Sequence, residues 1–481
     1  MSIKSNHAVT RRSFIATSAA STALLALGTR LPAQPTIRNF TLRAATGMVQ
    51  MASGPLRETP AWAYNGLVPG PELRARQGER LRIDVTNALA EDTTVHWHGL
   101  RLPNAMDGVP FLTQKPIAPG ETFGYEFDAV DAGTFWYHPH QRSFEQMGRG
   151  LSGPLIIDEP NPPRVDRDIT WVLDDWRLLE DGTIAEDFGA PMDMSHAGRV
   201  GNAVTINGKF PDRFTVQQGE RIRLRLINVA NARFFALDFG SLSAQIIALD
   251  GQPVTPHSPP GGVVVLGSAM RADIMLDCPA APGTQLQVVD RAYRNNEYRL
   301  IDIAYSDTPL RDSPPDWDIA LPANPLAEPD IATARRHEIL FTGGMMGAMV
   351  ERDMGIDQAR GMMGGMMGGV TGGGMWFVNG VAAEGPMLEP FLTLERAQSH
   401  VLELTNATAF THPIHLHGHS FRVLSRDGVP TQYREWLDTV LIAPRERIEI
   451  ALVADNPGDW MFHCHILEHQ AAGMMGVIRV A

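Results

Sequence analysis

One pattern, a turn followed by an alternating strand and an asparagine, occurs three times along the chain. The copies are RQGERLRIDVTN at 76–87, QQGERIRLRLIN at 217–228 and the weaker AQSHVLELTN at 397–406. In each copy a turn-forming Gly or Ser precedes alternating polar and apolar residues, which is the pattern of a half-buried strand. The copies lie roughly 140 to 180 residues apart, which is the size of one β-sandwich domain. The repeat therefore predicts three related β domains.

Composition and a second repeated element support this fold class. The chain contains 45 Gly and 35 Pro, together with short runs of aliphatic and β-branched residues, which favours many short strands and turns. GTFWYHPH at 133–140 matches GDWMFHCH at 458–465, so this second element recurs in the first and third domains. We predict an all-β fold of three β-sandwich domains. The domains span 36–160, 161–310 and 336–481, and a proline-rich linker occupies 311–335.

Histidines follow the repeat in domains 1 and 3 but not in domain 2. Counted from the asparagine of each copy, positions plus nine and plus eleven are histidines in domains 1 and 3, but Leu237 and Phe239 in domain 2. The second element adds a further His-x-His pair to each of domains 1 and 3. Four pairs in two equivalent halves predict one pseudo-symmetric metal cluster between domains 1 and 3, with domain 2 as a spacer or scaffold. The eight histidines are His96, His98, His138, His140, His415, His417, His463 and His465.

A separate set of ligands surrounds Cys464. Two histidines, a thiolate and a distant methionine form the ligand set of a blue-copper electron-transfer site. Neighbouring side chains of a strand point to opposite faces, so Cys464 should face a site within domain 3 while the histidines on either side of it face the cluster. Domain 1 has Pro139 at the matching position and should lack such a site. The candidate ligands are His412, Cys464, His469 and Met474, with Met475 as the alternative axial ligand.

These motifs make the chain resemble the multicopper oxidases, in particular bacterial periplasmic copper-efflux (cuprous) oxidases and laccase-like enzymes. The four motifs are HWHG at 96–99, HPH at 138–140, HPIHLHG at 412–418 and HCHILEHQAAGM at 463–474. The resemblance implies three Greek-key cupredoxin domains, four copper ions per chain, and four one-electron oxidations of substrate coupled to reduction of O₂ to two waters. It also implies type 1 copper on His412, Cys464, His469 and Met474, type 2 copper on His96 and His415, and the type 3 pair on His98, His138, His140, His417, His463 and His465.

Reduction of O₂ needs protons, and carboxylates near the cluster are the candidates to deliver them. Asp107, nine residues after His98, matches an acidic position beside the cluster in the family. In the copper-efflux relatives a proton-relaying glutamate directly follows the type 1 histidine, but here that residue is Gln470. An amide cannot relay protons in this way, so the prediction is that Glu468 or water substitutes, or that the enzyme turns over differently.

The segment 343–375 holds nine of the 22 methionines, and glycine fills much of the rest. No period of 2 or 3.6 persists in it, which favours a flexible low-complexity insertion over a packed element. Soft thioethers suit Cu(I), and the insertion resembles that of cuprous oxidases, so Cu(I) is the predicted substrate. The candidate Cu(I) ligands are Met345, Met346, Met349, Met354, Met362, Met363, Met366 and Met367, and Met375 ends the segment.

One departure from the cuprous oxidases leaves an alternative open. In those enzymes an acid and a methionine, four and two residues before the first type 1 histidine, hold the substrate Cu(I), whereas this chain has Thr408 and Phe410. The alternative is a laccase-like oxidase of phenols or aromatic amines, in which Asp438 would orient a phenol. A third hypothesis, a copper-binding or scaffold protein without activity, conflicts with the presence of all twelve ligands.

The N-terminal 34 residues are predicted to be a twin-arginine signal peptide. Arg11 and Arg12 precede an apolar run too short to span a bilayer, which predicts export to the periplasm without a stable membrane anchor. The net charge of -13 argues against a nucleic-acid partner. With Cys464 as a ligand, Cys278 has no disulfide partner and should be a buried hydrophobe. The expected partners are O₂ and either Cu(I) or a small phenol, and the expected state is a monomer.

Overall fold

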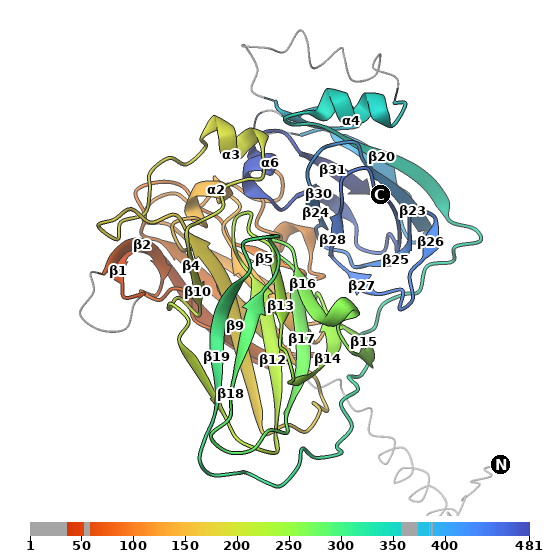
Figure 1. Cartoon of the computed structure of the whole chain (residues 1–481). Helices are drawn as coiled ribbons and strands as arrows, with labels where there is room; N and C mark the ends of the chain where they lie inside the picture. Colours follow the sequence, from red (N-terminus) through yellow and green to blue (C-terminus); the bar gives the residue numbers. More distant parts are fainter. Residues whose placement is uncertain (1–35, 52–57, 357–373, 384, 386–387) are drawn as a thin grey trace, which may run out of the picture. The chain divides into compact units, whose positions relative to one another are not determined.

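Nearly all regular structure in this protein is β-strand. The computed structural model describes residues 36–51, 58–356, 374–383, 385 and 388–481. In this part of the chain the strands form six sheets, and three consecutive stretches contribute two sheets each. They are called the first, second and third sheet pairs below, and run from red to blue in Figure 1. The predicted all-β fold class is confirmed.

The first sheet pair contains eight strands: β1 (Ile37–Val49), β2 (Thr59–Tyr64), β3 (Leu73–Arg76), β4 (Arg80–Asn87), β5 (His96–His98), β6 (Thr122–Asp128), β7 (Gly133–His138) and β8 (Gly153–Asp158). Their order is β2-β1-β4-β6 in one sheet and β3-β8-β7-β5 in the other.

The second sheet pair contains eleven strands: β9 (Arg167–Trp176), β10 (Ala203–Ile206), β11 (Arg213–Val216), β12 (Glu220–Asn228), β13 (Phe235–Asp238), β14 (Ser243–Leu249), β15 (Gln252–His257), β16 (Val263–Leu266), β17 (Arg271–Cys278), β18 (Gln285–Asp290) and β19 (Tyr298–Tyr305). The orders are β10-β9-β12-β17-β14-β15 and β11-β19-β18-β13-β16.

The third sheet pair contains twelve strands: β20 (Arg335–Gly343), β21 (Trp376–Val378), β22 (Pro390–Leu394), β23 (Ser399–Asn406), β24 (His412–Leu416), β25 (Phe421–Arg426), β26 (Val429–Pro430), β27 (Trp436–Leu437), β28 (Thr439–Ile442), β29 (Arg447–Val453), β30 (Gly458–Cys464) and β31 (Met475–Val480). The orders are β21-β20-β23-β29-β25-β26, with β27 beside β25, and β22-β31-β30-β24-β28. The short helices are η1 (Asn104–Met106), α2 (Ser143–Gln146), α3 (Pro191–Ser195), η2 (Pro260–Gly262), α4 (Gly347–Asp353) and α6 (Leu467–Ala471).

The repeated sequence forms the same strand in each sheet pair. β4, β12 and β23 lie parallel to β1, β9 and β20, and antiparallel to β6, β17 and β29, respectively. The asparagine that ends each copy is buried in all three cases. Its Nδ2 donates to carbonyls of the following loop, and its Oδ1 accepts the amide two residues on. The recurring asparagine therefore shapes the loop that leads to the next strand. The three residues are Asn87, Asn228 and Asn406.

The second sheet pair fills the histidine positions with core residues. Leu237 and Phe239 are buried in its hydrophobic core. Cys278 lies in the same core, and burial raises the pKa of its thiol to about 12, which confirms the prediction of a buried, inert cysteine. The stretch 311–334 contains no helix or strand, and β20 begins at Arg335, the last residue of the predicted linker. The domain boundaries themselves stay predictions, since Ile37–Ala481 forms one compact unit. The described part of the chain has no helix long and apolar enough to cross a membrane.

Candidate metal centre

Short strand segments bring the eight motif histidines together between the first and third sheet pairs. β5 pairs with β7, which sets His96 opposite His138, and β24 pairs with β30, which sets His415 opposite His463. Residues two apart on a strand share a face, so His96 and His98 of β5 present their rings on one side, and the second histidine of each other pair lies one or two residues beyond the end of β7, β24 or β30. All eight rings are buried.

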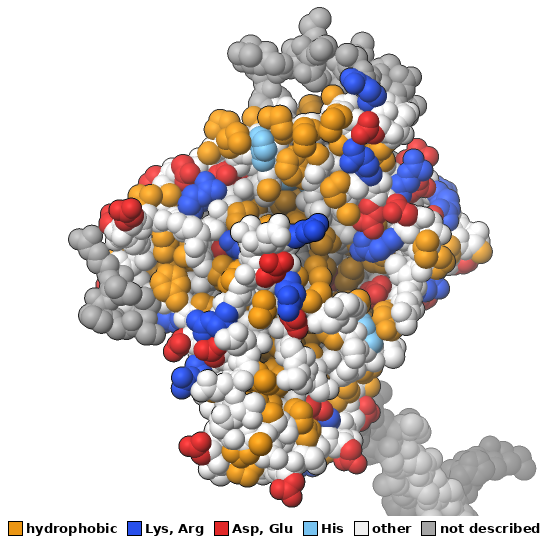
Figure 2. All heavy atoms as spheres, in the orientation of Figure 1, with side chains coloured by type: hydrophobic (Ala, Val, Ile, Leu, Met, Phe, Trp, Pro, Cys, Tyr) orange, Lys and Arg blue, Asp and Glu red, His pale blue; other side chains and the backbone are white. Residues whose placement is uncertain are grey.

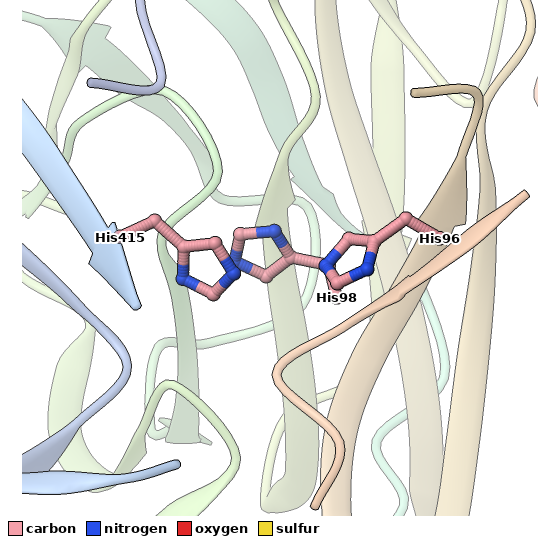
Figure 3. Close-up of side chains that lie close together, drawn as sticks. All are labelled: His96, His98 and His415. Carbon is pink, nitrogen blue, oxygen red and sulfur yellow. The ribbon is translucent and has the colours of Figure 1, made fainter. Parts of the chain in front are cut away.

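The eight histidines form three groups, with His98 in two of them, and in each group the ligand nitrogens lie within 4.8 Å of one another. Figure 3 shows one group, where His415 reaches from β24 toward His96 and His98 of β5. The rings of His98 and His415 are stacked, with centroids 3.8 Å apart. The sequence analysis set His96 and His415 apart from the other six histidines, but it did not divide those six further. The groups are His96, His98 and His415; His98, His138 and His465; and His140, His417 and His463.

Hydrogen bonds on the outer side of the rings fix which nitrogen faces inward. A backbone carbonyl only accepts, so the ring nitrogen beside it carries the proton and the other nitrogen holds a lone pair. Metal-binding histidines are usually oriented by such a bond. Four rings donate from Nδ1 at 2.8–3.0 Å: His96, His138, His415 and His463 bind the carbonyls of Asp107, Pro139, Asp438 and Cys464, respectively.

The inward-facing nitrogens fit a cluster of cations. In six of the eight motif histidines, one buried ring nitrogen has no hydrogen-bond partner among the described residues. The other two, His417 and His463, point Nε2 at each other across 3.1 Å while both Nδ1 atoms donate outward. Two facing lone pairs repel unless a cation lies beside them. Two nitrogens each about 2.0 Å from one ion, at a near-tetrahedral angle, would be about 3.3 Å apart. The six histidines are His96, His98, His138, His140, His415 and His465.

Burial keeps six rings of this cluster and the ring of His412 neutral, which is the form that binds a metal. Desolvation, followed by repulsion from neighbouring charged groups, places the pKa of seven histidines far below its ordinary value. They are His98, His138, His140, His412, His417, His463 and His465.

A second cluster lies inside the third sheet pair around Cys464. Its Sγ is 3.5 Å from His412 Nδ1 and 3.7 Å from His469 Nδ1, and the two nitrogens are 3.1 Å apart. All three side chains are buried. Burial raises the pKa of Cys464 well above the ordinary value, so the thiol is protonated until a metal binds and displaces the proton.

The two histidines of this second cluster are also oriented from behind. His469 Nε2 donates to the carbonyl of His196, at 2.5 Å, beyond the end of α3. His412 Nε2 donates to Thr408 Oγ1, at 2.7 Å, and that hydroxyl donates to the repeat asparagine Asn406. Both Nδ1 lone pairs therefore face the sulfur. Thr408 thus supports a ligand here, rather than holding a substrate ion.

The geometry distinguishes the two axial candidates. Met474 is buried in the core that contains Cys464, and the Cys464 amide donates to its carbonyl at 3.0 Å. Met475 is only half-buried and lines a cavity of about 290 Å³ that also reaches His140 and Gln470. This favours Met474 as the axial residue.

Asp107 lies where a carboxylate can serve the histidine cluster. It is buried, and its Oδ2 accepts from His417 Nδ1 at 2.8 Å. Its Oδ1 is 3.3 Å from His96 Nδ1 and has no hydrogen-bond partner in the described part of the chain.

Glu468 is a buried carboxyl group on α6. Burial raises its pKa to about 7, and Asn231 Nδ2 donates to its Oε1 at 3.1 Å. Over the described ranges, no hydrogen bond joins it to any of the eight histidines. Gln470 is also buried, and its Oε1 has no hydrogen-bond partner among the described residues.

Asp438 cannot orient a phenol, and this prediction is wrong. Its carboxylate is buried between the sheet pairs, is clamped by Arg271 and accepts from His98 Nε2 at 3.1 Å. The sequence WLDTV at 436–440 gives no indication that this segment packs against two other sheet pairs.

Exposed methionines gather near His469, partly from a source that the sequence analysis missed. Met345, Met346 and Met349 are 48%, 53% and 47% exposed, and Met192 of α3 is 65% exposed. The Met345 amide donates to the carbonyl of Ser195, which joins this segment to the end of α3. The motif MDMSH at 192–196 was the available signal. Met354 is half-buried, and Met362, Met363, Met366 and Met367 lie outside the described residues.

An all-β fold that buries imidazole and thiolate donors in two adjoining clusters defines a metal-dependent redox protein. Sequence profiles described as multicopper oxidase match residues 45–162, 167–296 and 363–481. The multicopper oxidase MmcO of Mycobacterium tuberculosis is 31% identical over 454 residues, with 88% of this chain and 83% of that protein covered. The chain therefore belongs to the multicopper oxidase family, whose members are copper-dependent oxidoreductases that use O₂ and a reducing substrate.

Two further comparisons bear on the substrate. Laccase-1 of Botryotinia fuckeliana is 30% identical over 460 residues, with 86% of this chain and 77% of that protein covered. A solved structure from Campylobacter jejuni, described as a multicopper oxidase and a metallo-oxidase, has a TM-score of 0.75 at 26% identity. The match covers 94% of this chain and 93% of the Campylobacter jejuni chain.

Proposed function

We propose that this multicopper oxidase is a cuprous oxidase that protects against copper by oxidising Cu(I) to Cu(II). Four Cu(I) ions, one O₂ and four protons would give four Cu(II) ions and two waters. The observation that carries this proposal is the surface of exposed methionines beside His469, named here the methionine surface. Its members are Met192, Met345, Met346 and Met349, with Met375 at its edge.

Four resident copper ions are assigned to the two clusters. When bound, copper would supply one-electron chemistry at the Cys464 cluster and reduction of O₂ at the histidine cluster. Cys464 lies between two histidines of the other cluster, so one residue of backbone on either side joins the two sites. The assignment is His412, Cys464, His469 and Met474 for type 1, His96 and His415 for type 2, and His98, His138 and His465 with His140, His417 and His463 for type 3.

The methionine surface is suited to Cu(I) by its chemistry and position. Thioethers are soft ligands that prefer Cu(I) to harder divalent ions. The surface adjoins the backbone carbonyl of His196, to which His469 Nε2 donates a hydrogen bond. Figure 2 shows apolar side chains gathered over α3, α6 and α4 at the top of the view. A Cu(I) ion held there would be separated from the Cys464 cluster by the His196–His469 contact.

Protons would reach the histidine cluster through the chain's own acids. Asp107 is the favoured group, because its carboxylate touches His417 and has a free oxygen in the cluster. Glu468 is kept as a second carrier on the Cys464 side, where its raised pKa of about 7 suits proton exchange near neutrality.

A laccase-like activity toward phenols is the second candidate, and the similarity to a relative named laccase favours it. Trp376 covers His469, with ring centroids 4.1 Å apart, and α3 covers its Nε2 edge. These contacts leave little room for a phenol ring at the histidine and favour the smaller ion. Export by a twin-arginine signal remains part of the proposal; residues 1–35 lie outside the described residues.

The test compares Cu(I) and phenol oxidation in one pair of variants. Changing Met192, Met345, Met346 and Met349 together to Leu keeps size and removes the thioethers. Changing Met48 to Leu is the control, since Met48 is also exposed but lies on β1. O₂ consumption should show a raised KM for Cu(I) in the quadruple variant, an unchanged kcat for a phenol, and no effect of Met48→Leu. Cu(I) oxidation that is absent in the wild type, or equal in both variants, would refute the proposal.

A further inference from the structure

Arg271 is a buried arginine of the second sheet pair that binds a carboxylate of the third. It starts β17 and is fully buried. Its Nη1 donates to Asp438 Oδ1 at 2.8 Å and its Nη2 to Asp438 Oδ2 at 2.6 Å. This two-point contact fixes the plane of the carboxylate as well as its position.

Asp438 in turn holds one histidine of the first sheet pair and one of the third. Its Oδ1 accepts from His98 Nε2 at 3.1 Å, and its carbonyl accepts from His415 Nδ1 at 2.9 Å. The neighbouring Thr439 hydroxyl donates to the same Oδ1 at 2.8 Å. His98 and His415 are the two stacked rings at the centre of Figure 3. The orientation of both rings therefore depends on one residue.

Asp250, also in the second sheet pair, holds both partners of this contact from the other side. Its Oδ1 accepts from the Arg271 amide at 3.0 Å. Its Oδ2 accepts from the Thr439 amide at 3.0 Å and from the Asp438 amide at 3.3 Å. The side chain is buried. Arg271 thus binds the side chain of Asp438, while Asp250 binds its backbone amide.

Gly99, the glycine of the HWHG motif, leaves the space that this arrangement needs. Its φ is +87°, and a Cβ there would lie 2.3 Å from Arg271 Nη2 and 2.6 Å from Asp438 Oδ2. The Arg271 Nε also donates to the carbonyl of Thr134 in the first sheet pair, at 3.2 Å. All three sheet pairs therefore meet at the guanidinium.

We infer that Arg271 is a positioning residue for the histidine cluster. Through Asp438 it sets the rings of His98 and His415, so the second sheet pair, which supplies none of the eight histidines, controls the copper position that His96 and His415 share. The inference rests on the proposed copper assignment but not on the identity of the substrate. A plain interdomain salt bridge would hold the sheets together without favouring one copper position.

The test uses copper-loaded protein with a substitution that keeps the charge but loses the two-point geometry. Arg271→Lys should weaken copper retention at the type 2 position about 10- to 100-fold, as loss of an orienting group commonly does. The type 2 EPR signal should fall during dialysis against a chelator, while the blue absorption of the Cys464 cluster remains. Arg223→Lys is the matched control, since Arg223 is equally buried and binds Glu159 of the first sheet pair. It should leave both signals in place.

Two outcomes would overturn the inference. Arg271→Lys with an unchanged type 2 signal and copper content would show that the guanidinium does not position the rings. If Arg271→Lys loses the type 2 EPR signal and the blue absorption to the same extent, Arg271 has a general structural role. If Arg271→Lys does not accumulate as folded protein, the isosteric Asp250→Asn carries the same expectation and the same two refutations. Cu(I) oxidation is not a readout here, so failure of the proposed substrate is recognised separately.

Discussion

The stability of the copper-free protein should depend strongly on pH. The folded protein buries neutral histidines, whereas the same histidines are solvated in the unfolded chain. Seven histidines have a pKa far below the ordinary value in the folded state. In the unfolded chain their pKa returns to about 6.5. Stability is therefore complete above pH 6.5 and is lost as the pH falls below it, since the unfolded state then binds more protons.

The size of this effect follows from the number of rings. A group with a pKa of about 6.5 is about 90% protonated at pH 5.5 and about 10% at pH 7.5. Seven such rings should take up about six protons on unfolding at pH 5.5 and at most about one at pH 7.5. Each ring contributes about 1.4 kcal/mol over this interval, and seven contribute about 10 kcal/mol. That equals the whole stability of an ordinary domain, about 5–15 kcal/mol.

Proton uptake on unfolding is measured by calorimetry of the copper-free protein in two buffers that differ in ionisation enthalpy. Changing His138 and His140 together to Gln should lower the uptake at pH 5.5 by about two protons. An uptake of one proton or fewer at pH 5.5 in the parent protein would refute the reasoning, because the rings would then be hydrated or already charged in the folded state.

Three further substitutions test separate parts of the structure. Gly418→Ala should abolish copper loading of the third sheet pair, because the residue has φ +66° and a Cβ would lie 2.3 Å from the Trp460 ring; normal loading would contradict this. Trp376→Ala should lower the free energy of unfolding by about 3–5 kcal/mol, since the ring is buried and its Nε1 donates to the Met194 carbonyl. Denaturant unfolding measures this free energy, and a loss below about 1 kcal/mol would argue against the observed packing of the ring. Arg223→Met should lower the free energy of unfolding by about 3–5 kcal/mol, because the buried carboxylates of Glu159 and Asp273 lose their ion pairs with Arg223. Adding Glu159→Gln and Asp273→Asn should recover part of this loss in denaturant unfolding. Equal stability of the single and triple variants would exclude the lost ion pairs as the cause.

The repeat made much of the fold and of the histidine cluster predictable. Matching offsets from the repeat asparagine identified equivalent strands, and strand alternation separated Cys464 from the histidines beside it. Both inferences use contacts that are local in sequence. They needed no knowledge of how the sheet pairs pack.

Features that depend on packing between the sheet pairs were not predictable. The contact of His469 with His196 and the grip of Arg271 on Asp438 join residues more than 150 positions apart. Asp438 was misread for the same reason, since WLDTV carries no sign that two other sheet pairs cover it. The second sheet pair was predicted to be a spacer or scaffold, and the particular contacts that it makes to both clusters were not predictable from the sequence.

Copper analysis of Cys464→Ser tests the central claim of two adjoining but separate copper sites. The loaded wild-type protein should hold about four copper ions per chain and be blue. The variant should hold about three, keep the EPR signal of the type 2 position and lose the blue absorption. A variant that stays blue, or that loses the copper of the histidine cluster together with the colour, would contradict the claim.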